Sequence, residues 1–203
     1  AQASQAPALA AYADFLAAEV ERRRRDWPEC SRRYAAAAAA FARIGMRRLA
    51  GLARLGEAEA LAEQGRVEEA RERIAAARAG GAAATDHVLA ETLALAAARV
   101  TLADAKASAN DLLAGAETMA ETAHGARALG RLPLAWRAAS LAAQLFGRVG
   151  DARKDEQMDV ARRCFEEVKM KTPVSHWSGL QADGEARALA QIPVDRAAAA
   201  APA

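Results

Sequence analysis

The chain contains few of the residues that favour β-strands or build a large aromatic core. Aromatic residues make up only 4% of it, and isoleucine, valine and threonine are sparse, so little of the sequence favours strands. No segment alternates apolar and polar residues over the length of a strand. About three residues in ten are instead alanine, which has the highest helix propensity. The composition therefore predicts an all-α protein whose helices approach one another closely.

Strong net charge, long apolar runs and closely spaced cysteines are also absent from the sequence. A net charge of +2, from nearly balanced acidic and basic residues, predicts neither a nucleic-acid partner nor a membrane partner. The longest apolar runs, such as residues 35–42, are far shorter than a membrane-spanning helix. Cys30 and Cys164 lack the spacing of metal ligands, which favours a reducing, cytoplasmic compartment. Because the first residue is not methionine, we expect a processed or excised piece, and the AQA start would also follow cleavage of a signal peptide.

An internal repeat organises the sequence. Residues 41–78 align without a gap with residues 126–163, and the glycines near the turns of the two segments coincide. The coinciding pairs are Gly45 with Gly130 and Gly65 with Gly150. Each pair is about 85 residues apart, which predicts two repeats of about 42 residues. These glycines suit helix ends, where glycine adopts the left-handed conformation at little cost.

Helix-capping residues occur where this period requires the other repeats to begin or turn. Asp86 is a good N-cap, Ser108 and Asp111 form a Ser-x-x-Asp cap, and Asp26 precedes a proline and a glutamate. Thr172-Pro173 should end the last helix. The predicted helices, paired into four hairpins, cover residues 6–24, 27–44, 46–64, 66–79, 86–106, 109–124, 131–148 and 151–171.

Two segments resemble tetratricopeptide repeats. The segment from Ala38 to Arg78 contains the turn Gly-Arg-Val-Glu-Glu-Ala-Arg at residues 65–71 and resembles tetratricopeptide hairpins of bacterial signalling proteins. The segment ALGRLPLAWRAASLAAQLFGRVGDA is similar to the last repeat of domains that follow kinase, ATPase or sigma-54-interacting modules, as in regulators resembling the maltose activator. The resemblance covers about residues 35–170. Two features depart from the family: the period exceeds the usual 34 residues, and the Trp-x-x-Leu-Gly-x-x-Tyr signature is not intact.

The resemblance implies a right-handed solenoid of about four helical hairpins, or about eight helices, over residues 1–178. It also implies an interaction platform of the kind found in bacterial signalling and regulatory proteins. Residues 179–203 are rich in alanine and contain proline, so we expect them to form a disordered tail.

No motif predicts catalysis or a cofactor. Gly51-x4-Gly56 has the spacing of a phosphate-binding loop, but the next residue is Glu57, where that motif requires lysine. Cys30 lies in the first turn of a predicted helix with two arginines after it, which could lower the pKa of its thiol, or it could be a structural cysteine. The arginine run at residues 22–25 could clamp an acidic or phosphate-bearing partner, or it could form a solvated helix end. We therefore expect no enzyme activity, no metal and no cofactor.

Partner-binding residues are expected on the first helix of each hairpin, because those helices usually line the concave face of such a stack. The large or polar residues outside the apolar stripes of these helices are Arg47, Arg54, Glu91, Trp136, Arg137 and Gln144. Trp136 would be a binding hot spot if it were part-exposed, and otherwise it fills the joint between the third and fourth hairpins.

The sequence thus predicts a non-catalytic module that binds a protein or peptide. The alternative is a regulatory domain that binds a small molecule in the concave cleft and changes the curvature of the stack. An enclosed apolar pocket lined by Trp136 and by leucine and alanine positions would favour the alternative, and an open polar groove would favour protein binding. Self-association is also expected, because terminal hairpins of a stack expose apolar faces unless they are capped.

Overall fold

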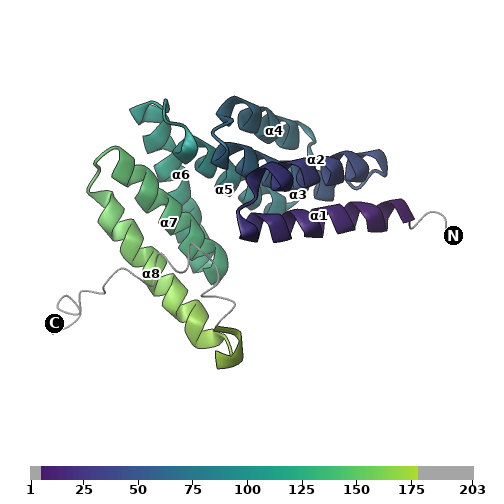
Figure 1. Cartoon of the computed structure of the whole chain (residues 1–203). Helices are drawn as coiled ribbons and strands as arrows, with labels where there is room; N and C mark the ends of the chain where they lie inside the picture. The colour runs from purple at the N-terminus through teal and green to yellow at the C-terminus, as the bar shows by residue number, and fades with distance from the viewer. Residues whose placement is uncertain (1–5, 178–203) are drawn as a thin grey trace, which may run out of the picture. The chain divides into compact units, whose positions relative to one another are not determined.

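The structure is a computed structural model that describes residues 6–177. Over these residues the chain forms eight α-helices, two short 3₁₀-helices and no strand (Figure 1). The helices are α1 (Ala6–Arg24), α2 (Trp27–Arg43), α3 (Arg47–Glu63), α4 (Val67–Ala79), η2 (Ala82–Ala84), α5 (His87–Ala103), α6 (Ala109–Ala128), α7 (Leu132–Arg148), α8 (Arg153–Lys171) and η3 (Val174–His176). The predicted all-α fold with about eight helices is confirmed, and the right-handed sense of a solenoid stays a prediction.

Predicted and observed helix ends differ most around the connection between α5 and α6. The α5 helix stops earlier than predicted because Asp104 has an extended conformation and its carboxylate accepts a hydrogen bond from the N–H of Lys106, at 2.8 Å. The α6 helix continues four residues past the predicted end at residue 124. Its end is set by Gly130, whose φ of 70° closes the helix. The Ser108–Asp111 cap at its start is confirmed, since the side chain of each residue accepts a hydrogen bond from the backbone N–H of the other.

One hydrogen-bond pattern closes most of the hairpin turns. At the α2–α3 turn Gly45 has a φ of 77° and donates its N–H to the carbonyl of Ala42, while the N–H of Met46 reaches back to the carbonyl of Phe41. This is the Schellman motif, which requires a left-handed residue just after the helix. The same two bonds recur at Gly65, Gly130 and Gly150, so the predicted glycine turns are confirmed. They also recur at the α1–α2 turn, where Arg25 with a φ of 61° takes the place of glycine.

The chain divides into two compact units, residues 1–119 (unit 1) and residues from 120 onward (unit 2), and α6 runs through the division. The single repeat domain over residues 1–178 therefore stays a prediction. The predicted tail at residues 179–203 lies outside the described residues.

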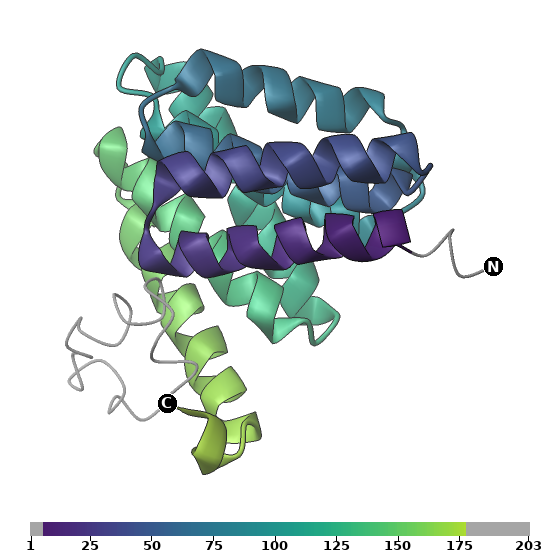
Figure 2. The same cartoon turned by 45° about the vertical axis from the view of Figure 1, so that its right-hand side comes forward.

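The α3 helix is the central element of unit 1 and packs against α2, α4 and α5, while α1 lies beside α2 (Figure 2). One core cluster joins α1, α2 and α3 around the fully buried rings of Tyr34 and Phe41. A second cluster joins α3, α4 and α5 around Leu55, Leu89 and Val100. Burial of these side chains supplies most of the stabilisation of the hairpins, at about 1.5–3 kcal/mol for each large apolar side chain.

The antiparallel pair α7 and α8 is the main packed hairpin of unit 2 (Figure 1). Trp136 of α7 and Phe165 of α8 meet edge to face, with 5.5 Å between ring centroids. The end of α8 is set by Thr172, which adopts an extended conformation before Pro173, as the sequence predicts. Beyond it the chain folds back, because the indole Nε1 of Trp177 donates to the carbonyl of Thr172 at 3.0 Å.

Candidate functional site

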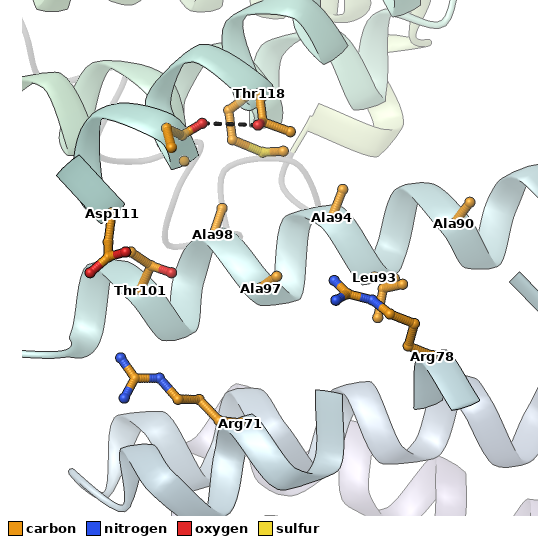
Figure 3. Close-up of a pocket in the computed structure, with 13 residues that line it drawn as sticks. Arg71, Arg78, Ala90, Leu93, Ala94, Ala97, Ala98, Thr101, Asp111 and Thr118 are labelled. Carbon is orange, nitrogen blue, oxygen red and sulfur yellow. Dashed lines mark hydrogen bonds between the residues drawn. The ribbon is translucent and has the colours of Figure 1, made fainter. Parts of the chain in front are cut away.

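A groove of about 720 Å³ opens on the surface of unit 1, between α4, α5 and the first part of α6 (Figure 3). Its floor is one face of α5, made of Ala90, Leu93, Ala94, Ala97, Ala98 and Thr101. Its walls are Arg71 and Arg78 from α4 and Asp111, Ala114, Gly115, Thr118 and Met119 from α6. All of these residues belong to unit 1.

The depth of the groove follows from the small side chains of α5. The floor residues recur at the three- and four-residue spacing that places them on one helix face. The neighbouring face carries Leu89, Ala96 and Val100, which are buried against α3 and α4 and hold α5 in place. Because four of the six floor residues are alanine, the floor lies close to the α5 backbone and a partner can approach it closely.

The α4 wall of the groove carries two guanidinium groups in different electrostatic environments. Arg71 donates to Glu68 at 2.7 Å and to Asp104 at 2.5 Å, so its charge is balanced by two carboxylates. A hydrogen bond from the backbone N–H of Lys106, together with Arg71, lowers the pKa of Asp104 below its usual value. Arg78 is exposed and has no hydrogen-bond or ion-pair partner among residues 6–177. Arg78 is therefore the cationic group of this wall that is available to a ligand.

The α6 wall carries one carboxylate. Asp111 accepts the hydroxyl of Ser108 at 2.7 Å and caps the start of α6. Thr118, further along, donates its hydroxyl to the carbonyl of Ala114 at 2.9 Å, within its own helix. The groove thus combines an apolar floor with a positive wall and a weakly negative one.

None of the six residues that were predicted from the sequence to bind a partner lines this groove. In unit 1, Arg47 is exposed at the start of α3, Arg54 is half-buried with its guanidinium near Gly80, and Glu91 is half-buried on α5. No signal in the sequence separated the alanines of the groove floor from the many alanines that lie in the core.

The other three selected residues belong to unit 2. Trp136 is 3% exposed and packs against Phe165, so it fills the interior of the α7–α8 hairpin and offers a partner little contact area. Arg137 lies over the Trp136 ring, 5.2 Å from its centroid. Gln144 is exposed and its amide donates to the carbonyl of Ser140 at 3.3 Å. The structure does not group these six residues into one site within either unit.

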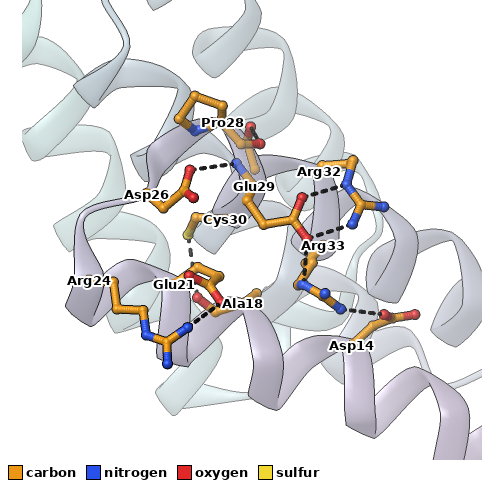
Figure 4. Close-up of polar contacts among 11 residues, drawn as sticks. Asp14, Ala18, Glu21, Arg24, Asp26, Pro28, Glu29, Cys30, Arg32 and Arg33 are labelled. Carbon is orange, nitrogen blue, oxygen red and sulfur yellow. Dashed lines mark hydrogen bonds and ion pairs between the residues drawn. The ribbon is translucent and has the colours of Figure 1, made fainter.

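Cys30 lies in the buried interface between α1 and α2, where its Sγ is 3.5 Å from the carbonyl of Ala18 (Figure 4). Burial raises the pKa of this thiol to about 12, although Arg22 acts in the opposite direction. The two arginines that follow it pair with Glu29, at 2.5 Å for Arg32 and 2.8 Å for Arg33. The hypothesis that these arginines lower the pKa of Cys30 is therefore wrong, and the structural interpretation holds. Cys164 is also buried, which raises the pKa of its thiol, and both cysteines are free.

Two of the four arginines in the run at residues 22–25 form ion pairs within α1. Arg22 pairs with Glu19 at 2.9 Å, and Arg24 pairs with Glu21 at 3.3 Å (Figure 4 draws the second pair). Arg23 stays exposed. These contacts favour the interpretation of the run as a solvated helix end, where arginine complements the helix dipole.

The described part of the chain lacks the features of three other kinds of site. Gly51 and Gly56 lie inside α3 and face Leu89 and Tyr34, which excludes a phosphate-binding loop there. Between residues 6 and 177 no three His, Cys, Asp or Glu side chains converge to hold a metal ion. Within the same range, no helix combines the length and the apolar character that crossing a membrane requires.

A second surface feature lies on α1. Four large apolar side chains at helical spacing are exposed on it, namely Leu9 (66%), Tyr12 (40%), Leu16 (62%) and Val20 (46%). Tyr12 is held on one side by an edge-to-face contact with Phe41, 5.2 Å between centroids. We call these four residues the α1 stripe.

No family model, no curated protein and no solved structure matches this chain.

Proposed function

We propose that this chain is a non-catalytic protein-interaction module that binds a segment of another protein in the groove between α4, α5 and α6. The observation that carries the proposal is the shape and lining of the groove: an alanine floor flanked by one wall with an unpaired guanidinium and one with a carboxylate. Helical surfaces of this kind bind peptides through apolar contacts in a groove and gain specificity from charged residues at its rim.

The open form of the groove supports a protein partner over a small molecule. Its volume lies in the range of small-molecule pockets, but such pockets bury most of the surface of their ligand. Here the floor is a helix face and the walls stand on two sides only, so a small ligand would keep a large exposed area. A peptide that continues along α5 would gain contacts beyond the groove.

The wider setting of this function rests on the resemblance to tetratricopeptide domains of bacterial regulators. On the basis of this resemblance, we propose that the chain is a scaffold or regulatory domain of a larger cytoplasmic signalling protein. Arg47, Arg54, Glu91, Arg137 and Gln144 stay candidates for further partner contacts outside the groove.

Partner capture with a groove-filling variant tests the proposal. Ala90→Gln/Ala94→Gln places two longer, uncharged, helix-compatible side chains on the groove floor, four residues apart. Ala35→Gln/Ala39→Gln makes the same change at the same spacing on α2, away from the groove, and serves as the control. Each purified chain would be immobilised and exposed to lysate of the source cell, retained proteins identified by mass spectrometry, and the affinity of the purified partner measured by calorimetry.

We expect a specific protein to bind the native chain and the control equally, and to bind the groove-filled variant at least about tenfold more weakly. The circular dichroism spectra of all three chains should be the same. Equal binding to all three would exclude the groove as the site. Retention of no protein would contradict the interaction module, and a screen of small molecules by thermal shift would then address the ligand-sensing alternative.

A further inference from the structure

We infer that the segment bound in the groove is an amphipathic helix of about three turns that has small or aliphatic residues on its inner face and a carboxylate placed to meet Arg78. This inference rests on the proposed function and specifies the chemistry of the partner. It is carried by the asymmetric charge of the two walls and by the dimensions of the floor.

The length of the helix follows from the floor. The floor residues extend from Ala90 to Thr101 along α5, which at 1.5 Å per residue is about 17 Å, or three turns of helix. Packed helices lie 8–10 Å apart, and the closest approaches require small side chains at the contact. The half-buried alanines at positions 90, 94 and 97 provide such a surface, so a helix fits this floor with its own small or aliphatic residues facing inward.

The acidic character of the partner follows from the α4 wall. Arg71 and Arg78 are seven residues apart, which places them on the same face of α4 about two turns, or roughly 10 Å, from each other. Both point toward the groove from α4, as Figure 3 shows. A guanidinium beside an apolar surface is well suited to a carboxylate, which it can bind through two parallel hydrogen bonds.

The two arginines should contribute unequally. Arg71 already donates to Glu68 and Asp104, so a partner carboxylate near it would compete with two others. Arg78 has no such partner in the described part of the chain, so a carboxylate there adds an ion pair without breaking one. The acidic preference should therefore be confined to one position of the bound helix, at the Arg78 end of the groove.

The α6 wall gives the bound helix a direction. Asp111 lies at the Thr101 end of the floor, across α5 from Arg71, as Figure 3 shows. A second carboxylate of the partner placed on that side would meet Asp111 and be repelled. A helix with its acidic residue at the Arg78 end and neutral or basic residues at the Asp111 end is electrostatically complementary to both walls.

Selection from a peptide library tests this inference with synthetic peptides in place of the natural partner. A display library of random 14-residue peptides would be selected against the full chain, and the enriched peptides synthesised and measured by fluorescence anisotropy. The proteins compared are the native chain, Arg78→Gln, Arg78→Glu, the exposed-arginine control Arg23→Gln, and the groove-filled Ala90→Gln/Ala94→Gln. Circular dichroism melts of each variant would show that the fold is kept.

The expected peptides are amphipathic, become helical on binding, and share one Asp or Glu at a fixed place relative to their apolar residues. Arg78→Gln should weaken their binding about three- to tenfold, and Arg23→Gln should leave it unchanged. A peptide in which the shared acidic residue is replaced by lysine should prefer Arg78→Glu to the native chain, which a purely structural role of Arg78 would not produce.

Two further outcomes separate the two proposals. Peptides that lose binding to the groove-filled variant but lack a shared acidic residue, or that bind Arg78→Gln as well as the native chain, would overturn the acidic helix and leave the groove in place. Peptides that bind the groove-filled variant equally well, or a selection that enriches none, would overturn both.

Discussion

The absence of a side chain at Gly56 lets the α3 backbone approach Tyr34 closely. Gly56 lies in the middle of α3, and a Cβ at this position would come within 2.5 Å of Cζ of Tyr34. The Tyr34 ring cannot move aside easily, because it is 1% exposed and its hydroxyl donates to the carboxylate of Glu19. Burial, followed by this hydrogen bond, raises the pKa of Tyr34 above its usual value, so the hydroxyl stays protonated as the donor. Gly56 thus allows α3 to lie directly against the ring.

We therefore expect Gly56→Ala to lower the free energy of unfolding by about 1–3 kcal/mol, as overpacking of a core does, although alanine is the better helix former by about 1 kcal/mol. Gly125→Ala is the matched control, since Gly125 is exposed inside α6 and a Cβ there would meet nothing within 4 Å. The control should be stabilised by up to about 1 kcal/mol. Urea denaturation followed by circular dichroism measures both, and equal stabilisation of the two variants would contradict the contact with Tyr34.

The environment of a residue could be predicted from the sequence only where residues close to it in the chain determine it. The N-caps Asp26 and Asp86 are confirmed, because each accepts a backbone N–H three residues ahead in the chain, at 3.2 Å and 3.0 Å. Burial of Cys30 and of Trp136 was one of two interpretations that the sequence left open, and local sequence alone could not decide between them. Their burial depends on α1 and α8, whose faces meet those residues only after the hairpins pack. The arginines after Cys30 left an activated thiol open as one interpretation, but burial is the largest influence on the pKa of Cys30 and raises it.

At the scale of helices and turns, the repeat is most regular where the hairpins turn. Five helices end in the same pair of backbone hydrogen bonds, four of them with glycine and one with Arg25 in the left-handed conformation. Left-handed backbone costs a residue with a Cβ about 1–2 kcal/mol. Arg25 is exposed, so no packing contact compensates it. The first hairpin therefore carries a strained turn that the others avoid.

Arg25→Gly should relieve this strain and raise the free energy of unfolding by about 0.5–1 kcal/mol, after allowance for the greater freedom of glycine in the unfolded chain. Arg25→Ala keeps a Cβ and removes the same charge, so it should give no comparable gain. Thermal and urea denaturation of the three proteins measure the difference. An equal gain in both variants would show that the charge of Arg25, and not its backbone conformation, is the destabilising feature.

The helices could be predicted from the sequence more completely than the groove. Helix ends followed from glycine, proline and capping residues, and the observed ends lie within four residues of the predicted ones. On α5, Leu89 and Val100 are buried while Val88, also a large apolar residue, is 48% exposed. The residues of the groove floor on the same helix are mostly alanine. Because alanine suits a core, a helix surface and a groove equally, its pattern does not show which of them a helix face will become.

At the scale of the whole chain, the α1 stripe is the surface on which the predicted self-association can be tested. Inner helices of a stack are covered on both sides, as α3 is by α2 and α5. The α1 helix packs against α2 and leaves Leu9, Leu16 and Val20 largely exposed on another face. Single exposed apolar residues are common on protein surfaces, but a stripe of them along one helix is where we expect copies of the chain to meet.

We expect the native chain to sediment as a mixture whose average mass rises with protein concentration. The variant Leu9→Gln/Leu16→Gln should reduce that rise, because it removes the two most exposed members of the stripe. Both side chains are more than half exposed, so their replacement should change the unfolding midpoint little. Leu129→Gln/Met170→Gln removes apolar side chains that are 74% and 80% exposed but lie outside the stripe, and it is the control. Sedimentation velocity over a wide concentration range distinguishes the possibilities. An equal reduction by the control would indicate general surface stickiness, and a native chain that stays monomeric throughout would show that the stripe does not join copies of this chain.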